Sequence, residues 1–181
     1  MAIDATTVTE IFQRLGAVLQ RPTLLCLVGS TPGIASGQPD RHTPHVDVWF
    51  PASEFDTGDL SRACREAGIL FDPKGVVEPD RIYIQVVRPG IVRLPADFAP
   101  EVIGEFGNLT VAMPPPEHLV AAKLVRGAEI DIDDVVWWVR QRRLDAADVE
   151  RAIEKLPSER DRETALENMT FVQLVMGKDW R

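Results

Sequence analysis

Two short apolar runs near the N-terminus carry the residues whose types and spacing could bind a nucleotide or a metal. The first run, Leu24–Val28, ends in Gly29-Ser30, and the second carries His45 and Asp47 at alternate positions. Alternate residues of a strand point to the same face, so His45 and Asp47 should project together. Gly29 has no Cβ, and a ligand could therefore approach the backbone closely there.

The residues after Ser30 predict the start of a helix. Pro32 suits the first helical position, and Ser30 or Thr31 suits the cap. A helix that begins there would direct free backbone N–H groups toward an anion such as a phosphate. The alternative is purely structural, because Gly-Ser after an apolar strand is common and a His-x-Asp pair often lies at the edge of a loop.

The order of these residues resembles the nucleotidyltransferase fold of the polymerase-β superfamily, in which an apolar residue, Gly and Gly or Ser are followed by Asp-apolar-Asp. The run Arg41-His-Thr-Pro-His-Val-Asp47 more narrowly resembles the Arg-x-Thr-x-Asp-x-Asp run of bacterial proteins related to AbiEii-type abortive-infection toxins. The resemblance implies that Asp47 is a catalytic carboxylate. It also implies that Gly29, Ser30 and Arg41 contact a nucleotide.

The chain departs from this pattern at the residues that should bind metal. His45 stands where the first Asp is expected, which leaves His45 and Asp47 as the metal ligands. Mg²⁺ prefers carboxylates, whereas imidazole suits Zn²⁺, Cu²⁺ or Ni²⁺. The family usually supplies a third carboxylate from a later strand, where our alignment gives Arg93, with Gln85 as the nearest polar alternative. We expect a degenerate metal site, with Mg²⁺ or another divalent metal needed only if the protein is active.

The second half of the chain extends the resemblance. AbiEii-like proteins have a helix with Lys and then Arg, followed by an acidic helix start, and the matching residues are Lys123, Arg126, Asp131 and Asp134. The resemblance implies that Lys123 and Arg126 contact a nucleotide. Structural pairing is the alternative for Lys123. For Asp131, Asp133 and Asp134 we favour helix capping and a salt bridge to Lys123 or Arg126.

Periodicity predicts an α+β fold with a mixed sheet of about five strands, flanking helices and a C-terminal helical segment. We expect a single domain over 1–181, with a nucleotidyltransferase-like core over 1–113 and a helical subdomain over 114–181. The expected helices cover 7–19, 57–67, 115–126, 131–142, 146–156 and 158–176. The expected strands cover 24–28, 45–50, 82–87, 91–94 and 109–113, and 82–87 should form an antiparallel hairpin with 91–94.

Composition limits the partners that the protein can have. The 181-residue chain carries a net charge of −8, which argues against a broad nucleic-acid-binding surface. No apolar stretch approaches the length of a membrane span, and the N-terminus has no signal-peptide features. We therefore expect a cytoplasmic protein that is not associated with a membrane. Cys26 and Cys64 read as buried apolar residues.

Three functional hypotheses follow. The first is a bacterial nucleotidyltransferase-like protein that is inactive or binds a nucleotide weakly and acts through a protein partner. The second is an active, toxin-like nucleotidyltransferase that uses Ser30, Asp47 and Lys123 with a reshaped metal site. The third is the non-catalytic partner in a toxin–antitoxin-like pair.

Two expectations concern residues outside these motifs. The last helix has an apolar stripe that we assign to the core, with a homodimer interface as the alternative. Its members are Leu166, Met169, Val172 (or Phe171) and Met176.

The metal site would be rebuilt if Asp40, Asp72 or Glu105 lay beside Asp47.

Overall fold

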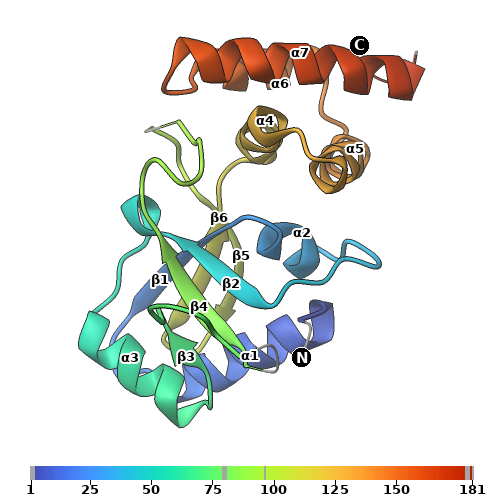
Figure 1. Cartoon of the computed structure of the whole chain (residues 1–181). Helices are drawn as coiled ribbons and strands as arrows, with labels where there is room; N and C mark the ends of the chain where they lie inside the picture. The colour runs from blue at the N-terminus through green and yellow to red at the C-terminus, as the bar shows by residue number, and fades with distance from the viewer. Residues whose placement is uncertain (1–2, 79–80, 96, 178–179, 181) are drawn as a thin grey trace. The chain divides into compact units, whose positions relative to one another are not determined.

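The computed structural model describes residues 3–78, 81–95, 97–177 and 180, which form two compact units (Figure 1). The first unit comprises Met1–Arg88 and Pro100–Met113, and the second comprises Pro89–Ala99 and Pro114–Arg181. The helices of the second unit therefore follow Pro114, and the segment Pro89–Ala99 belongs to the same unit.

A mixed sheet forms the centre of the first unit. Within the described residues its six strands are β1 (Thr23–Val28), β2 (His45–Trp49), β3 (Leu70–Phe71), β4 (Tyr83–Val87), β5 (Glu101–Phe106) and β6 (Leu109–Met113). They lie in the order β3-β4-β2-β1-β6-β5. β1 pairs antiparallel with β2 and parallel with β6, and β4 lies parallel to both β2 and β3. The mixed α+β fold is confirmed, with one strand more than expected.

The expected hairpin between 82–87 and 91–94 is wrong. β4 pairs with β2 and β3 instead, and Pro89 and Val92 form only an isolated bridge. Ile91 is 69% exposed and only Leu94 of this run is buried, so the apolar residues do not form a strand that packs on the core. The sequence analysis also missed β3, which has two residues, and β5, whose side chains are mostly exposed or half-buried.

The helices of the first unit begin close to their expected residues. They are α1 (Ala5–Val18), α2 (Thr31–Ala35), the 3₁₀ turn η1 (Phe50–Ala52) and α3 (Thr57–Glu66). The cap of α1 is Asp4, whose carboxylate accepts the N–H of Thr7 at 2.8 Å, and not Thr7 as the capping-box pattern suggested. Asp56 caps α3 in the same way, as expected.

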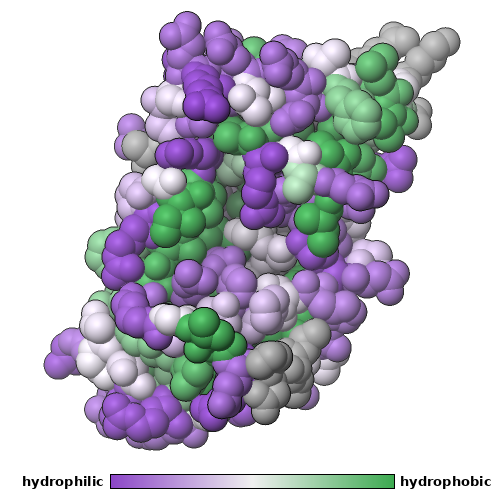
Figure 2. Space-filling view, in the orientation of Figure 1, coloured by the Kyte–Doolittle hydropathy of each residue, from purple (hydrophilic) through white to green (hydrophobic). Residues whose placement is uncertain are grey.

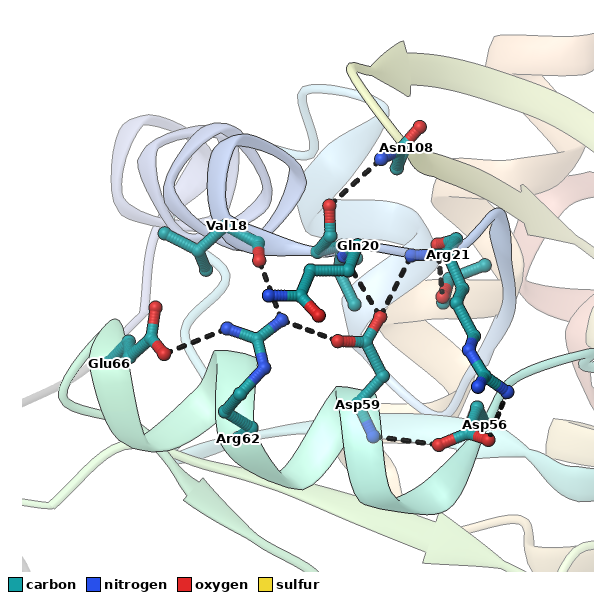
Figure 3. Close-up of polar contacts among 10 residues, drawn as sticks. Val18, Gln20, Arg21, Asp56, Asp59, Arg62, Glu66 and Asn108 are labelled. Carbon is teal, nitrogen blue, oxygen red and sulfur yellow. Dashed lines mark hydrogen bonds and ion pairs between the residues drawn. The ribbon is translucent and has the colours of Figure 1, made fainter.

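A polar network ties the end of α1 to α3 (Figure 3). The Asp59 carboxylate accepts the backbone N–H groups of Gln20 and Arg21, each at 2.9 Å. Arg62 donates to Asp59 and to the carbonyl of Val18, the latter at 2.8 Å. The hydrogen bond from Arg62 lowers the pKa of the Asp59 carboxyl, which therefore stays ionised. These contacts hold the turn that leads into β1.

Gly16 lets α1 lie directly against the backbone of β5. A Cβ on Gly16 would be 1.7 Å from the carbonyl oxygen of Phe106, a distance that no side chain can occupy. The rings of Phe12 and Phe106 pack with their centroids 5.7 Å apart. This close approach buries the apolar face of α1, which includes Ile11 and Leu15.

The two cysteines are buried in the first unit, as expected. Cys26 lies on β1 and Cys64 on α3, and both are free thiols. Burial raises the pKa of each thiol to about 12. Both therefore stay protonated at neutral pH and pack as small apolar residues.

Four helices form the described part of the second unit, and all four were expected. They are α4 (Pro116–Arg126), α5 (Glu129–Arg142), α6 (Ala146–Glu154) and α7 (Glu159–Met176). The stripe on α7 is confirmed only in part, because Met169, Val172 and Met176 are buried whereas Leu166 and Phe171 are 46% and 54% exposed. Figure 2 shows hydrophobic side chains gathered toward the C-terminal end of this helix. No helix of the described residues is both long enough and apolar enough to span a membrane.

His118 is a buried polar residue of α4. It is 5% exposed, its ring meets that of Phe98 edge-on, and its Nδ1 has no hydrogen-bond partner. Burial lowers the pKa of His118, with an opposing effect from Glu117 and a further lowering by Lys155. The folded state therefore favours the neutral imidazole.

This histidine should make the stability of the protein depend on pH. The folded pKa lies below the ordinary value of 6.5, so the unfolded chain binds more protons as the pH falls. The stabilisation is complete above about pH 6.5 and is lost as the pH falls toward the folded pKa. Urea unfolding at about pH 7.5 and about pH 5 should show a larger loss in the wild type than in His118→Leu. Equal losses in the two proteins would contradict this account.

A second prediction concerns the contact between α1 and β5. Gly16→Ala should lower the free energy of unfolding by about 3 kcal/mol, because the helix must move away from the Phe106 carbonyl. Alanine in an unobstructed helix would instead be stabilising by about 0.5–1 kcal/mol. Gly58→Ala is the matched control, since its Cβ would meet only the Asp56 side chain at 3.3 Å, and the change should stay under about 1 kcal/mol. Similar losses in the two variants would contradict the prediction.

Candidate functional site

β2 brings His45 and Asp47 together on one face of the sheet. The Nε2 atom of His45 lies 3.2 Å from the Oδ2 atom of Asp47, and both side chains are half-buried. Val46 and Val48, which alternate with them along the strand, are fully buried on the other face. The shared face that the alternating pattern predicted is confirmed.

β4 adds Tyr83 and Gln85 to this face. The parallel register pairs His45 with Tyr83 and Asp47 with Gln85. The Tyr83 hydroxyl lies 3.0 Å from Nδ1 of His45, and the two rings are stacked with centroids 4.9 Å apart. Sequence reasoning missed Tyr83 as part of the site, because the pairing of two strands 38 residues apart leaves no local signal.

One tautomer of a neutral His45 satisfies both of its contacts. With the proton on Nε2, the ring nitrogen Nδ1 accepts from the Tyr83 hydroxyl, and the Nε2–H group lies beside the Asp47 carboxylate at 3.2 Å. Burial raises the pKa of Tyr83, and the charge of Asp47 adds to this effect, so the phenol keeps its proton. The three side chains therefore lie in a row, with a hydrogen bond between Tyr83 and His45 and a 3.2 Å contact between His45 and the single carboxylate of Asp47.

Gly29 makes room for the Asp47 carboxylate. Its φ is +69°, and a Cβ placed there would be 2.5 Å from Oδ2 of Asp47. The open space above the glycine, which we expected a ligand to use, is occupied by this side chain. Glycine is required for two reasons, since a left-handed φ and a missing Cβ are both needed.

Ser30 and Arg41 lie next to each other in the first unit. The Arg41 guanidinium donates to Oγ of Ser30 at 2.6 Å. Ser30 is the cap residue of α2, as expected, but its side chain makes no capping hydrogen bond. Since α2 has only five residues, its dipole is small, and the serine hydroxyl serves Arg41 instead.

Lys123 and Arg126 belong to the second unit, where they form ion pairs with buried aspartates of α5. The Nζ atom of Lys123 lies 2.6 Å from Asp134 and 3.6 Å from Asp131, and Arg126 makes a bidentate contact with Asp131. Lys123 is 7% exposed, Asp131 is 0% and Asp134 is 1% exposed. The salt bridges that we favoured are confirmed for Asp131 and Asp134. The helix capping that we favoured is wrong, because the cap residue of α5 is Ala128 and no side chain makes a capping hydrogen bond there. Nucleotide contact by Lys123 and Arg126 stays a prediction.

Arg93 does not lie in the position of a third carboxylate. It lies outside the sheet in the second unit, with Nε 3.7 Å from Asp161, and Gln85 is the residue that pairs with Asp47. The alignment of Arg93 with a strand was wrong because residues 91–94 form no strand.

The carboxylates that could have rebuilt the site do not gather around Asp47. Asp72 is held by Lys74 at 2.7 Å and by the N–H of Val86 at 3.2 Å. Among the described residues no group of three or more His, Cys, Asp and Glu side chains is placed to hold a metal, which excludes such a cluster with Asp40 or Glu105 as well. The donor set on β2 and β4 does not fit a pair of Mg²⁺ ions, because these need several carboxylate oxygens.

Comparison with known proteins identifies the class of fold. No protein-family model and no curated protein matches the chain. Among solved structures it is similar to an antigenic nucleotidyltransferase-like protein from Paracoccidioides brasiliensis, with a TM-score of 0.55 and 14% sequence identity. The match covers 99% of this chain and 94% of that protein. The chain therefore has a nucleotidyltransferase-like fold.

The buried Lys123 cluster gives a test of structural pairing. Lys123→Met removes the cation that lies 2.6 Å from the buried Asp134 carboxylate and should lower the free energy of unfolding by about 3–5 kcal/mol. Lys155→Met is the control, since Lys155 is exposed, and it should change stability by less than about 1 kcal/mol. Thermal and urea unfolding would measure both. A Lys123→Met protein as stable as the control would show that the ion pairs are not structural.

Proposed function

We propose that this protein is a nucleotidyltransferase-like protein with a degenerate metal site, which binds a nucleotide weakly or not at all and acts by binding rather than by catalysis. The observation that carries the proposal is the chain of Tyr83, His45 and Asp47, beside which Gln85 occupies the register position opposite Asp47. Nucleotidyl transfer relies on metal ions to neutralise phosphate charge and to activate the attacking oxygen. A single carboxylate, already contacted by an imidazole, supplies too few oxygen ligands for that task.

An active nucleotidyltransferase with a reshaped metal site is the alternative. It is supported by the resemblance to AbiEii-related proteins, which extends from Gly29-Ser30 to Lys123 and Arg126, and by the position of Asp47 beside Gly29. In that case Asp47 would be the catalytic carboxylate, and a divalent metal would need ligands from the substrate or from water. A non-catalytic role in a toxin–antitoxin-like pair agrees with the main proposal, because it requires a protein partner and no metal.

Restoring the missing carboxylates tests the proposal. The wild type should show weak or no binding of nucleoside triphosphates with Mg²⁺ or Mn²⁺ in isothermal titration calorimetry, and no transfer of label from α-³²P-labelled triphosphates to protein or RNA. His45→Asp combined with Gln85→Asp should bind Mg²⁺ at least about tenfold more tightly, because three carboxylates would then share one face. The matched control, His45→Asn with Gln85→Asn, changes the same positions without adding charge and should bind metal as the wild type does.

Catalysis by the wild type would contradict the proposal. Tight, metal-dependent triphosphate binding by the wild type, with label transfer that Asp47→Asn abolishes, would establish the active alternative. If the wild type neither binds a triphosphate nor transfers label and the restored variant gains metal affinity, the degenerate site is supported.

A further inference from the structure

A cavity of about 430 Å³ lies in the second unit, where α5 ends and α6 begins. This volume falls within the range of small-molecule sites. Its apolar lining is provided by Val139, Leu144 and Met176, and its polar lining includes Arg140, Arg143 and Trp180. The cavity is built from second-unit residues alone, so it is independent of the site on β2.

Two arginines and one aspartate line this cavity, so positive charge is in excess there. Arg140 and Arg143 are three residues apart at the end of α5, and within the described part of the chain neither guanidinium makes a hydrogen bond or an ion pair. Asp145 also lines the cavity, but its carboxylate accepts the N–H of Asp148 at 2.7 Å and caps α6. Two neighbouring positive charges repel each other, and a bound anion would relieve that repulsion.

Trp180 supplies a buried donor that also lacks a partner. The ring lines the cavity and is 2% exposed, and its Nε1 atom makes no hydrogen bond. Buried N–H groups in folded proteins are nearly always paired, so an unpaired one beside a cavity indicates an acceptor that is missing. The acceptor must be an oxygen or another atom with a lone pair, because an indole can only donate.

Arg143 ends α5 with a left-handed backbone conformation. Its φ is +54°, and glycine is the residue that usually takes this left-handed position at a helix C-terminus. Arginines in the last turn of a helix also complement its dipole, and this accounts for Arg140. It does not account for the unpaired indole N–H of Trp180.

We propose that this cavity binds a small organic anion. A carboxylate or phosphate group would accept hydrogen bonds from Arg140, Arg143 and the indole N–H of Trp180. The apolar body of the ligand would lie against Val139 and Leu144. The two headgroups share this chemistry, and the experiment separates them.

Isothermal titration calorimetry on the full chain with phenyl phosphate, benzoate and neutral benzyl alcohol tests the proposal. At least one of the two anions should bind saturably, and benzyl alcohol should bind at least about tenfold more weakly. The tighter of the two anions identifies the headgroup. Arg143→Gly should weaken anion binding by about tenfold while leaving the melting temperature the same or higher, because glycine suits the left-handed backbone.

Further variants separate the site from a general effect of charge. Arg140→Gln should weaken binding to a similar extent, and Trp180→Phe, which keeps a ring and removes the N–H, should weaken it several-fold. Arg151→Gln removes one positive charge from an exposed ion pair with Asp148 on α6 and should bind as the wild type does. Absence of saturable binding by both anions, equal affinity for benzyl alcohol, or wild-type affinity in both Arg143→Gly and Arg140→Gln would overturn the proposal.

Discussion

The pairing of β2 with its two neighbours determines what the candidate site can contain. The antiparallel pairing with β1 places Asp47 opposite Val28, next to Gly29, and the parallel pairing with β4 places Tyr83 and Gln85 beside His45 and Asp47. A shift of either register by one residue would exchange these side chains for buried valines and isoleucines. The contents of the site are therefore as firmly fixed as the core on the other side of the sheet.

The sequence predicts those features whose signals are local. The alternation of β2, the proline and glycine that bound α4, and the acidic cap of α3 are each visible within a few residues, and each corresponds to an element close to the expected position. β5 was missed because an edge strand with both faces largely exposed carries no burial pattern, and it is defined only by its pairing with β6. The run at 91–94 was misread because its apolar residues pair with no neighbouring strand, although Leu94 is buried. The partnership of Tyr83 with His45 depends on strand order, which no local signal specifies.

The two units neutralise their aspartates by different means. In the second unit Asp131 and Asp134 are almost fully buried, and permanent cations from Lys123 and Arg126 offset the cost of removing them from water. In the first unit Asp47 is half-buried, and its Oδ2 atom lies 3.2 Å from Nε2 of the His45 imidazole. The buried aspartates of the second unit therefore need the cations beside them. The half-buried carboxylate of Asp47 can also be stabilised by water.

This difference also decides which residues carry information about function. Gly29 has a left-handed backbone and lies directly beneath the Asp47 carboxylate, and both features require glycine. Its presence therefore follows from the position of Asp47, whether or not catalysis occurs. Positions 45 and 85 are half-buried, and an aspartate at either one could reach water. Such a substitution would leave the buried faces of β2 and β4 unchanged. His45 stacks on Tyr83, and neither His45 nor Gln85 carries a negative oxygen, which is the kind of ligand that Mg²⁺ prefers.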